Sequence, residues 1–277
     1  MKASSETHAY EHARDVAVEA AMQAARLIRT HAGRLQEAAV QHKGTHDLVT
    51  NVDEASQVLI TQILRRAYPE YAVLAEEGAD AATLTEIADG HRWIVDPIDG
   101  TTNFTHGVPP YAVSIALQRG AEVVVGVVLE VARKELFTAI RGKGAYHNGA
   151  RIGVSRRATL ERSLLATGFP YRTFDHVECY LEVFGRFLRQ SRGVRRFGAA
   201  AIDLAYVACG RFDGFYETGL NAWDVAAGIV LVEEAGGRVT DYRNAPNPLF
   251  DKQILASNGL LHDAMLDILT PMREMRL

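Results

Sequence analysis

Apolar and polar positions follow a helical spacing in the first part of the chain. Between residues 12 and 35, and again between residues 53 and 67, apolar side chains recur at intervals of three or four and would line one face of a helix. Tyr68-Pro69 follows the second segment, and a proline at that place ends a helix. The polar stretch of residues 41–46 is expected to be a loop. The chain therefore begins with two amphipathic helices and a polar connection.

From about residue 70 the pattern changes to short apolar segments that are typical of strands. A hairpin is expected across Arg119-Gly120, and Asn148-Gly149 marks another tight turn. The expected strands are 71–75, 92–95, 111–118, 122–131, 136–140, 163–167, 212–217, 238–241 and 253–257, and the later helices are 175–190, 198–209, 223–234 and the segment from about 260. Helices on the faces of largely antiparallel sheets predict the α/β class with α+β character, as a layered sandwich.

Pattern and composition describe an ordinary globular chain. The 277 residues carry 30 Lys+Arg and 34 Asp+Glu, which gives a formal net charge of −4. No repeat or low-complexity linker divides the chain, but its pattern shifts near residues 142–155. We therefore expect one unit, residues 1–277, with two lobes at approximately 1–150 and 151–277.

Charge and apolar runs also bear on partners. The sequence pI is about 6.2, whereas a nucleic-acid-binding domain commonly has a pI above ~9, so we do not expect nucleic acid as a partner. The N-terminus lacks the apolar core of a signal peptide. The longest strongly apolar run, residues 225–232, is shorter than the ~20 residues that span a bilayer. We expect no membrane association and a cytoplasmic location.

Two carboxylates and a glycine follow directly on a predicted strand, in Asp96-Pro97-Ile98-Asp99-Gly100. Pro97 disfavours helical backbone at Asp96, so we expect the chain to leave the strand extended and then turn. Ile98 offers a backbone carbonyl between the carboxylates, and Gly100 permits a ligand to approach the backbone closely. The N–H groups of Gly100 and Thr101 would bind an anion if a short helix begins there. Alone, the motif is more typical of a turn with a capping carboxylate.

Further acids at strand ends and helix starts change this interpretation. Glu76-Glu77 ends a predicted strand, Asp224 stands at the start of a predicted helix, and Asp47 and Asp53 flank the start of another. Singly, such residues are solvated, cap a helix or pair with its dipole. Gathered in one crevice, they would repel one another, and a hard divalent cation would relieve the repulsion. Oxygen ligands without a His or Cys cluster favour magnesium, and two bridged metal ions beside an anion-binding turn are typical of phosphate ester hydrolysis.

In these motifs and their order the chain resembles the inositol monophosphatase family of magnesium-dependent, lithium-sensitive phosphatases. The resemblance runs from about Asp47 to Asn258. It implies the layered αβαβα sandwich of that family, with mixed and largely antiparallel sheets, as a single catalytic unit that forms a homodimer. The motifs that carry it are Glu76-Glu77, residues 96–101, Gly142-Lys143-Gly144-Ala145, Asp203-Leu204-Ala205-Tyr206, Asp213-Gly214-Phe215-Tyr216-Glu217, residues 223–228 and Glu234-Ala235-Gly236-Gly237.

The resemblance also implies roles for individual residues. Glu76, Asp96 and the carbonyl of Ile98 would hold a first Mg²⁺ ion, which activates the attacking water. Asp96, Asp99 and Asp224 would hold a second, which neutralises the leaving oxygen, and the family offers a third, weaker site near Glu76.

The same resemblance assigns the remaining contacts. Thr101, with Asp53 behind it, would orient or deprotonate the nucleophilic water. The N–H groups of Gly100 and Thr101 would grip the phosphate. The hydroxyls of the polyol would meet Asp99, Ala200 through its backbone, and Glu217, with Asp224 close to the leaving group.

The chain departs from the family pattern at a few positions. Ala75 precedes Glu76 where glycine is frequent, and Gly198 is followed by Ala199, which removes a hydroxyl contact to substrate. His42 and His46 are four positions apart, but the intervening glycine opposes a helix, so a solvated loop explains them better than a metal site. The connection that holds Lys43 is short, and we assign that residue no role.

The expected reaction is hydrolysis of inositol 1-phosphate and related small polyol phosphates by in-line attack of water, without a phosphoenzyme. The same chemistry on fructose 1,6-bisphosphate, histidinol phosphate or phosphoadenosine phosphate stays open, although Glu217 favours a polyol. A regulatory protein of the same fold that contacts RNA or transcription machinery is a third reading. The intact set of acids argues against it, and the basic run 192–196 is the only feature in its favour.

Overall fold

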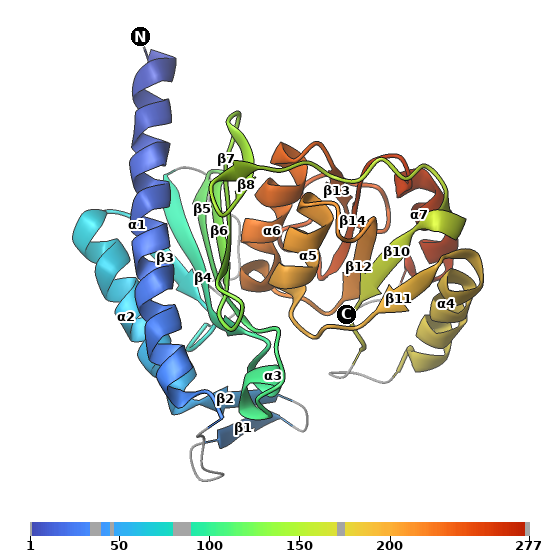
Figure 1. Cartoon of the computed structure of the whole chain (residues 1–277), viewed down its shortest axis with the longest axis horizontal. Coiled ribbons are helices and arrows are strands. Elements are labelled where there is room, and N and C mark those ends of the chain that lie inside the picture. The colour runs from blue at the N-terminus through green and yellow to red at the C-terminus, as the bar shows by residue number, and fades with distance from the viewer. Residues whose placement is uncertain (1, 34–39, 45–46, 80–89, 171–174, 275–277) are drawn as a thin grey trace.

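The computed structural model describes residues 2–33, 40–44, 47–79, 90–170 and 175–274, which form alternating layers of helices and sheets. Figure 1 shows, from left to right, two long helices, a seven-stranded sheet, a central helical layer, a five-stranded sheet and a last pair of helices. The helices of these layers are α1 (Lys2–His31) and α2 (Asn51–Ala67), then α5 (Ala200–Ala208) and α6 (Ala222–Glu234), then α4 (Val177–Gln190) and α7 (His262–Leu269). The expected αβαβα sandwich is confirmed.

The larger sheet is antiparallel except at one edge. Its strand order follows the sequence, and only β3 runs parallel to its neighbour β4. The strands are β3 (Ala72–Ala75), β4 (His91–Asp99), β5 (Ala112–Arg119), β6 (Glu122–Glu130), β7 (Glu135–Ile140), β8 (Gly144–His147) and β9 (Ala150–Arg151). The predicted turn at Asn148-Gly149 joins β8 to β9, and both residues have positive φ angles of 48° and 81°. That backbone suits a tight hairpin.

The smaller sheet is mixed. Its order is β11-β10-β12-β14-β13, with β10 parallel to β11 and β12, and β14 antiparallel to both of its neighbours. The strands are β10 (Leu164–Thr167), β11 (Gly193–Arg195), β12 (Gly214–Thr218), β13 (Arg238–Thr240) and β14 (Gln253–Ser257). The basic run 192–196 thus contributes the edge strand β11.

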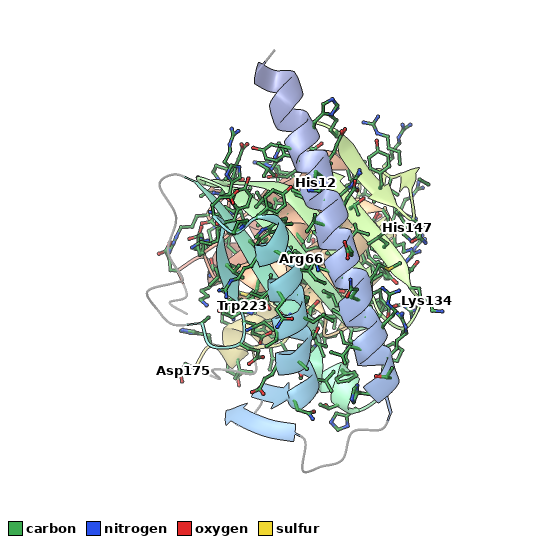
Figure 2. All side chains as sticks on the ribbon, turned by 90° about the vertical axis from the view of Figure 1, so that its left-hand side faces the viewer. His12, Arg66, Lys134, His147, Asp175 and Trp223 are labelled. Atoms are coloured by element: carbon green, nitrogen blue, oxygen red, sulfur yellow. The ribbon has the colours of Figure 1, made fainter. Side chains whose placement is uncertain are left out.

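Helix α2 starts with a strong local signal. The Thr50 side chain accepts from the N–H groups of Val52 and Asp53, and the Asp53 carboxylate accepts from the N–H of Thr50, which is a capping box. The buried side chains Ile60, Ile63 and Leu64 lie on the face toward the sheet. Figure 2 shows α1 and α2 side by side across the outer face of the larger sheet.

The central helices are largely apolar and buried on nearly all sides because each lies between two sheets. Contact with the larger sheet is close at Gly126 in β6, where a Cβ atom would stand 2.7 Å from the carbonyl oxygen of Ala227 in α6. Between the two helices, a Cβ on Gly228 would meet the Cβ of Leu204 at 2.5 Å. Glycine at both positions permits this spacing.

Some expected boundaries were wrong. The helix expected at 12–35 is α1, which begins at Lys2 and ends at His31. Part of the expected loop at 41–46 lies in the strand β1 (Val40–Gly44), which pairs with β2 (Asp47–Thr50). Strands as short as these give little alternating pattern, so the sequence offered no signal. The side chains of His42, Lys43 and Asp47, and residue His46 altogether, lie outside the described parts.

The strand that leads into the acidic motif is longer than expected. It was expected to end before Asp96, whereas β4 continues through Asp99 to the short helix α3 (Thr101–Thr105). Within the described parts of the chain, no helix combines the length and the apolar character that crossing a membrane requires.

Candidate metal and phosphate site

An irregular register brings Asp96 and Asp99 together. In β4, Asp96 pairs with Ser114 and Asp99 with Ala112, so β4 contains one residue more than β5 over this stretch. Three residues apart on a regular strand, the two side chains would point to opposite faces. The extra residue shifts the alternation, and Pro97, which has no N–H to donate, falls inside the irregularity. The two carboxylates can therefore converge.

Asp96, Asp99 and Asp224 form one group. One carboxylate oxygen of each lies within 4.8 Å of the others, although Asp224 comes from α6, more than 120 residues after β4. Asp96 is 1% exposed and Asp99 7%. This arrangement brings the first and second halves of the chain to a shared site.

Backbone N–H groups hold each of these carboxylates in place. Asp96 Oδ1 accepts from the N–H of Ile98 at 3.0 Å, and Asp224 Oδ2 accepts from the N–H of Asn221 at 2.6 Å. Asp99 accepts from Ala200 at 3.2 Å and from Ala201 at 2.8 Å, at the start of α5. The acids are thus oriented before any ligand binds.

The electrostatics of the group are unfavourable without a cation. Burial raises the pKa of Asp96 well above its usual value, and the charges of Glu76, Asp99 and Asp224 raise it further. Burial also raises the pKa of Asp99 to about 7, with Asp224 adding to the shift and the backbone N–H donors opposing it. Clustered carboxylate oxygens suit a hard divalent cation such as Mg²⁺. The donor set therefore fits the ion expected from the sequence.

Glu76 lies beside this group. Among the described residues, the close group has three members and Glu76 is not one of them. Of the neighbouring charges, that of Glu76 nevertheless raises the pKa of Asp96 the most. Its backbone N–H donates to the carbonyl of Val95 at 3.2 Å, which places Glu76 alongside the residue before Asp96.

Thr101 joins the acidic motif to α2. Its hydroxyl lies 3.0 Å from Asp53 Oδ1 and 3.0 Å from the carbonyl oxygen of Ile98, so its single proton has two acceptors. Asp53 is fully buried. Burial raises the pKa of Asp53 to about 6, against the lowering effect of hydrogen bonds from Thr50 and Thr101. A carboxyl group with such a pKa can accept a proton near neutral pH.

Of the remaining expected contacts, Gly100 and Ala200 lie at the same end of β4. Gly100 has a φ of 88°, and a Cβ there would stand 3.2 Å from the carbonyl oxygen of Gly198. The N–H of Ala200 is already used by Asp99. Glu217, in β12, lies over Gly168, since a Cβ on that glycine would overlap its carboxylate at 1.8 Å.

Sequence reasoning did not assign a role to Asp203, although an acid in the apolar helix α5 is itself a signal. Asp203 is 1% exposed, and neither of its carboxylate oxygens has a hydrogen-bond partner among the described residues. Burial raises the pKa of Asp203 well above its usual value, and the charges of Glu217 and Asp99 add to the effect.

The chain is similar to known proteins in sequence and in overall structure. A sequence model of the Inositol monophosphatase family matches residues 9–272. A protein named Nus factor SuhB from Pseudomonas aeruginosa is 46% identical over 93% of this chain and 95% of its own length. A protein named inositol-1-monophosphatase from Mesorhizobium japonicum is 43% identical over 91% and 94%. The crystal structure of the extragenic suppressor protein suhB from Bartonella henselae superimposes with a TM-score of 0.86 at 41% identity, over 93% of this chain and 98% of that one.

Proposed function

Because this chain belongs to the inositol monophosphatase family, we propose that it hydrolyses inositol 1-phosphate and related small polyol phosphates in a Mg²⁺-dependent reaction. The observation that supports this most directly is the group formed by Asp96, Asp99 and Asp224. Next to it lies the hydrogen-bonded pair of Thr101 and Asp53. Cation ligands beside a proton acceptor are what water-driven ester hydrolysis requires.

We propose that two Mg²⁺ ions bind at this donor set. One ion would be held by Glu76, Asp96 and the carbonyl of Ile98. The other would be held by Asp96, Asp99 and Asp224. A third ion would bind near Glu76. When bound, magnesium supplies Lewis acidity that favours water as a nucleophile and offsets charge on the phosphate ester.

The proposed proton path uses Thr101 and Asp53. The Thr101 hydroxyl donates to Asp53 Oδ1, which leaves an oxygen lone pair free to accept a proton from the attacking water. As that proton reaches Thr101 Oγ1, the proton of Thr101 passes to Asp53. The water oxygen forms a bond to phosphorus while the ester P–O bond opposite breaks, and the alcohol leaves after taking up a proton from solvent.

The substrate contacts complete the proposal. The N–H groups of Gly100 and Thr101 would hold the phosphate, and Asp99, Ala200, Glu217 and Asp224 would face the polyol and the leaving oxygen. Glu217 is the residue that most favours a polyol, because a carboxylate accepts hydrogen bonds from vicinal hydroxyl groups.

A substrate panel tests the proposal. Phosphate release would be measured from inositol 1-phosphate, fructose 1,6-bisphosphate, histidinol phosphate and phosphoadenosine phosphate, with Mg²⁺ and with excess EDTA. We expect the highest kcat/KM for inositol 1-phosphate, no release with EDTA, and inhibition by lithium. A higher kcat/KM for another member would assign that substrate instead, and release that persists in EDTA would refute the metal-dependent reaction.

Since a similar protein is named Nus factor SuhB, a regulatory protein that contacts RNA or transcription machinery stays open as a second function for this chain. The chain's net charge of −4 does not favour direct contact with nucleic acid. Fluorescence anisotropy with a labelled RNA tests this reading, and we expect no saturable binding at physiological salt.

We also propose that the two lobes work as a single catalytic unit, in the cytoplasm, as a homodimer. The acids that form the metal group come from both lobes, which supports the single unit. Light scattering coupled to gel filtration would test the dimer, with a monomer mass as the contrary result.

A further inference from the structure

The chain segment that carries Glu76 is held from two sides. On one side, the backbone N–H of Glu76 donates to the carbonyl oxygen of Val95 in β4. On the other side, the Gln57 side chain bonds both backbone groups of Glu77, since Nε2 donates to the carbonyl oxygen at 2.8 Å and Oε1 accepts from the N–H at 2.8 Å. The amide thus takes the place that a neighbouring strand would occupy.

The ladder of the sheet ends just before this segment. The ladder between β3 and β4 runs from Ala72 to Ala75, and β3 is at the edge of the described sheet. Glu76 and Glu77 lie beyond the last ladder pair. The side-chain amide of Gln57 therefore replaces backbone pairing at the position next to a proposed metal ligand.

Gln57 belongs to a set of contacts on one face of α2. Asp53, Ser56 and Gln57 have the spacing that places side chains together on a helix. Asp53 bonds Thr101, and the hydroxyl of Ser56 donates to the carbonyl of Pro97 at 3.3 Å. The first two turns of α2 therefore contact the acidic motif at two points and the Glu76 segment at a third. A rigid helix fixes the distance between those segments.

We propose that Gln57 is a positioning residue, which sets the place of the Glu76 carboxylate relative to Asp96 and thereby the affinity of the site for its first Mg²⁺ ion. The inference rests on the proposed function, because it takes Glu76 as a ligand. Substitution of residues that orient metal ligands commonly weakens metal binding by ~10–100-fold. Removal of the amide leaves Glu76 with more conformational freedom, which binding must then restrict.

The surroundings of Gln57 leave space for substituted side chains and offer a control residue. Gln57 is only partly buried and lines, with Glu77, a cavity of about 400 Å³ between α2 and β3. A side chain of similar length can be accommodated there without overpacking. Gln62 lines the same cavity from the same helix, and no hydrogen bond of its side chain is found within the described residues. It is therefore a matched control.

The experiment compares Gln57→Met and Gln57→Glu with Gln62→Met and Gln62→Glu. Methionine removes both hydrogen bonds, whereas glutamate keeps the acceptor for the N–H of Glu77 and loses the donor. Magnesium binding to the full chain would be measured by isothermal titration calorimetry, and the Mg²⁺ concentration that gives half-maximal hydrolysis would be measured in parallel. Melting in EDTA would check that each variant folds.

We expect the Kd for Mg²⁺ to rise about tenfold or more in Gln57→Met and less in Gln57→Glu. At saturating Mg²⁺, KM for the substrate should stay within about twofold of the wild type, because no substrate contact is changed. Both Gln62 variants should match the wild type.

Three results would overturn the inference. Unchanged Mg²⁺ affinity in both Gln57 variants would show that Glu76 is placed without the amide. An equal loss in the Gln62 variants would assign the effect to the cavity or to charge. If the wild type itself neither binds Mg²⁺ nor hydrolyses the substrate, the proposed function fails as well, and that outcome is distinct from the first two.

Discussion

The Asp99 carboxylate accepts a 2.8 Å hydrogen bond from the backbone N–H of Ala201, across 102 residues of sequence. The bond joins the end of β4, in the larger sheet, to the first turn of α5, in the central helical layer. A helix N-terminus stabilises a nearby negative charge, which partly offsets the burial of this acid. A proposed metal ligand is therefore fixed by the contact between layers.

Asp96→Asn tests the metal assignment. We expect kcat to fall by roughly 1,000-fold or more, since the residue would ligate both ions. The fold should survive, because burial and neighbouring acids already raise the pKa of Asp96 and make its charged form unfavourable in the folded protein. In EDTA, the Tm of the variant should equal or exceed that of the wild type, and the rise in Tm on adding Mg²⁺ should be lost.

Asp267→Asn is the control for this substitution. Asp267 is exposed on α7. Its substitution by asparagine removes one negative charge, as Asp96→Asn does, but away from the acidic group. Activity and the Mg²⁺-induced rise in Tm should be unaltered in it. Full Mg²⁺-dependent activity in Asp96→Asn would refute the assignment.

Thr101→Val removes a hydroxyl and keeps the shape of the side chain. The proposed proton path requires that hydroxyl, so we expect kcat to fall by about 100-fold or more. KM should change little, because the backbone N–H of Thr101 remains available to the phosphate. Steady-state kinetics at saturating Mg²⁺ provide the measurement. A variant with wild-type kcat would mean that water is activated without Thr101.

Gly168→Ala tests the role of Glu217. A Cβ at residue 168 would occupy the position of the Glu217 carboxylate, which is the far end of a flexible side chain and would be displaced. We expect KM for inositol 1-phosphate to rise about tenfold, as for loss of one hydrogen bond to a charged group. Tm should change by no more than a few degrees. Unchanged KM in both Gly168→Ala and Glu217→Gln would remove Glu217 from the substrate site.

His262 predicts an acid-dependent loss of stability. Its ring nitrogens are 2.9 Å from the hydroxyl groups of Thr240 and Ser257, and its side chain is fully buried. Burial lowers the pKa of His262 to about 4. Because the unfolded chain takes up a proton near pH 6.5 and the folded chain only near pH 4, stability is present above pH 6.5 and falls as the pH drops between these values.

Urea denaturation between pH 7 and pH 4 measures this effect. The wild type should lose roughly 1–3 kcal/mol more than His262→Gln over this range. Equal slopes of unfolding free energy against pH in the two proteins would show that His262 does not titrate in this way.

Local patterns predicted most of the elements correctly, because each depends on neighbours in sequence. Helical spacing located α2, and Asn148-Gly149 predicted the turn between β8 and β9. The pairing of β1 with β2 was missed, since that short hairpin shows no clear apolar alternation. Edge strand β11 was missed because its residues were considered only as a basic run that bears on partners.

By itself, the sequence determined the kinds of residue available for chemistry: acids at the ends of apolar strands and at helix starts, with no cysteine or histidine cluster beside them. Only the tertiary structure decided that Asp96, Asp99 and Asp224 meet, because their convergence depends on an extra residue in β4 and on the packing of α6 against the larger sheet. The tertiary structure likewise decided the contact of Gln57 in α2 with Glu77, which lies 20 residues later in the chain, after β3. Such contacts follow from how layers pack, and no local pattern along one chain encodes that packing.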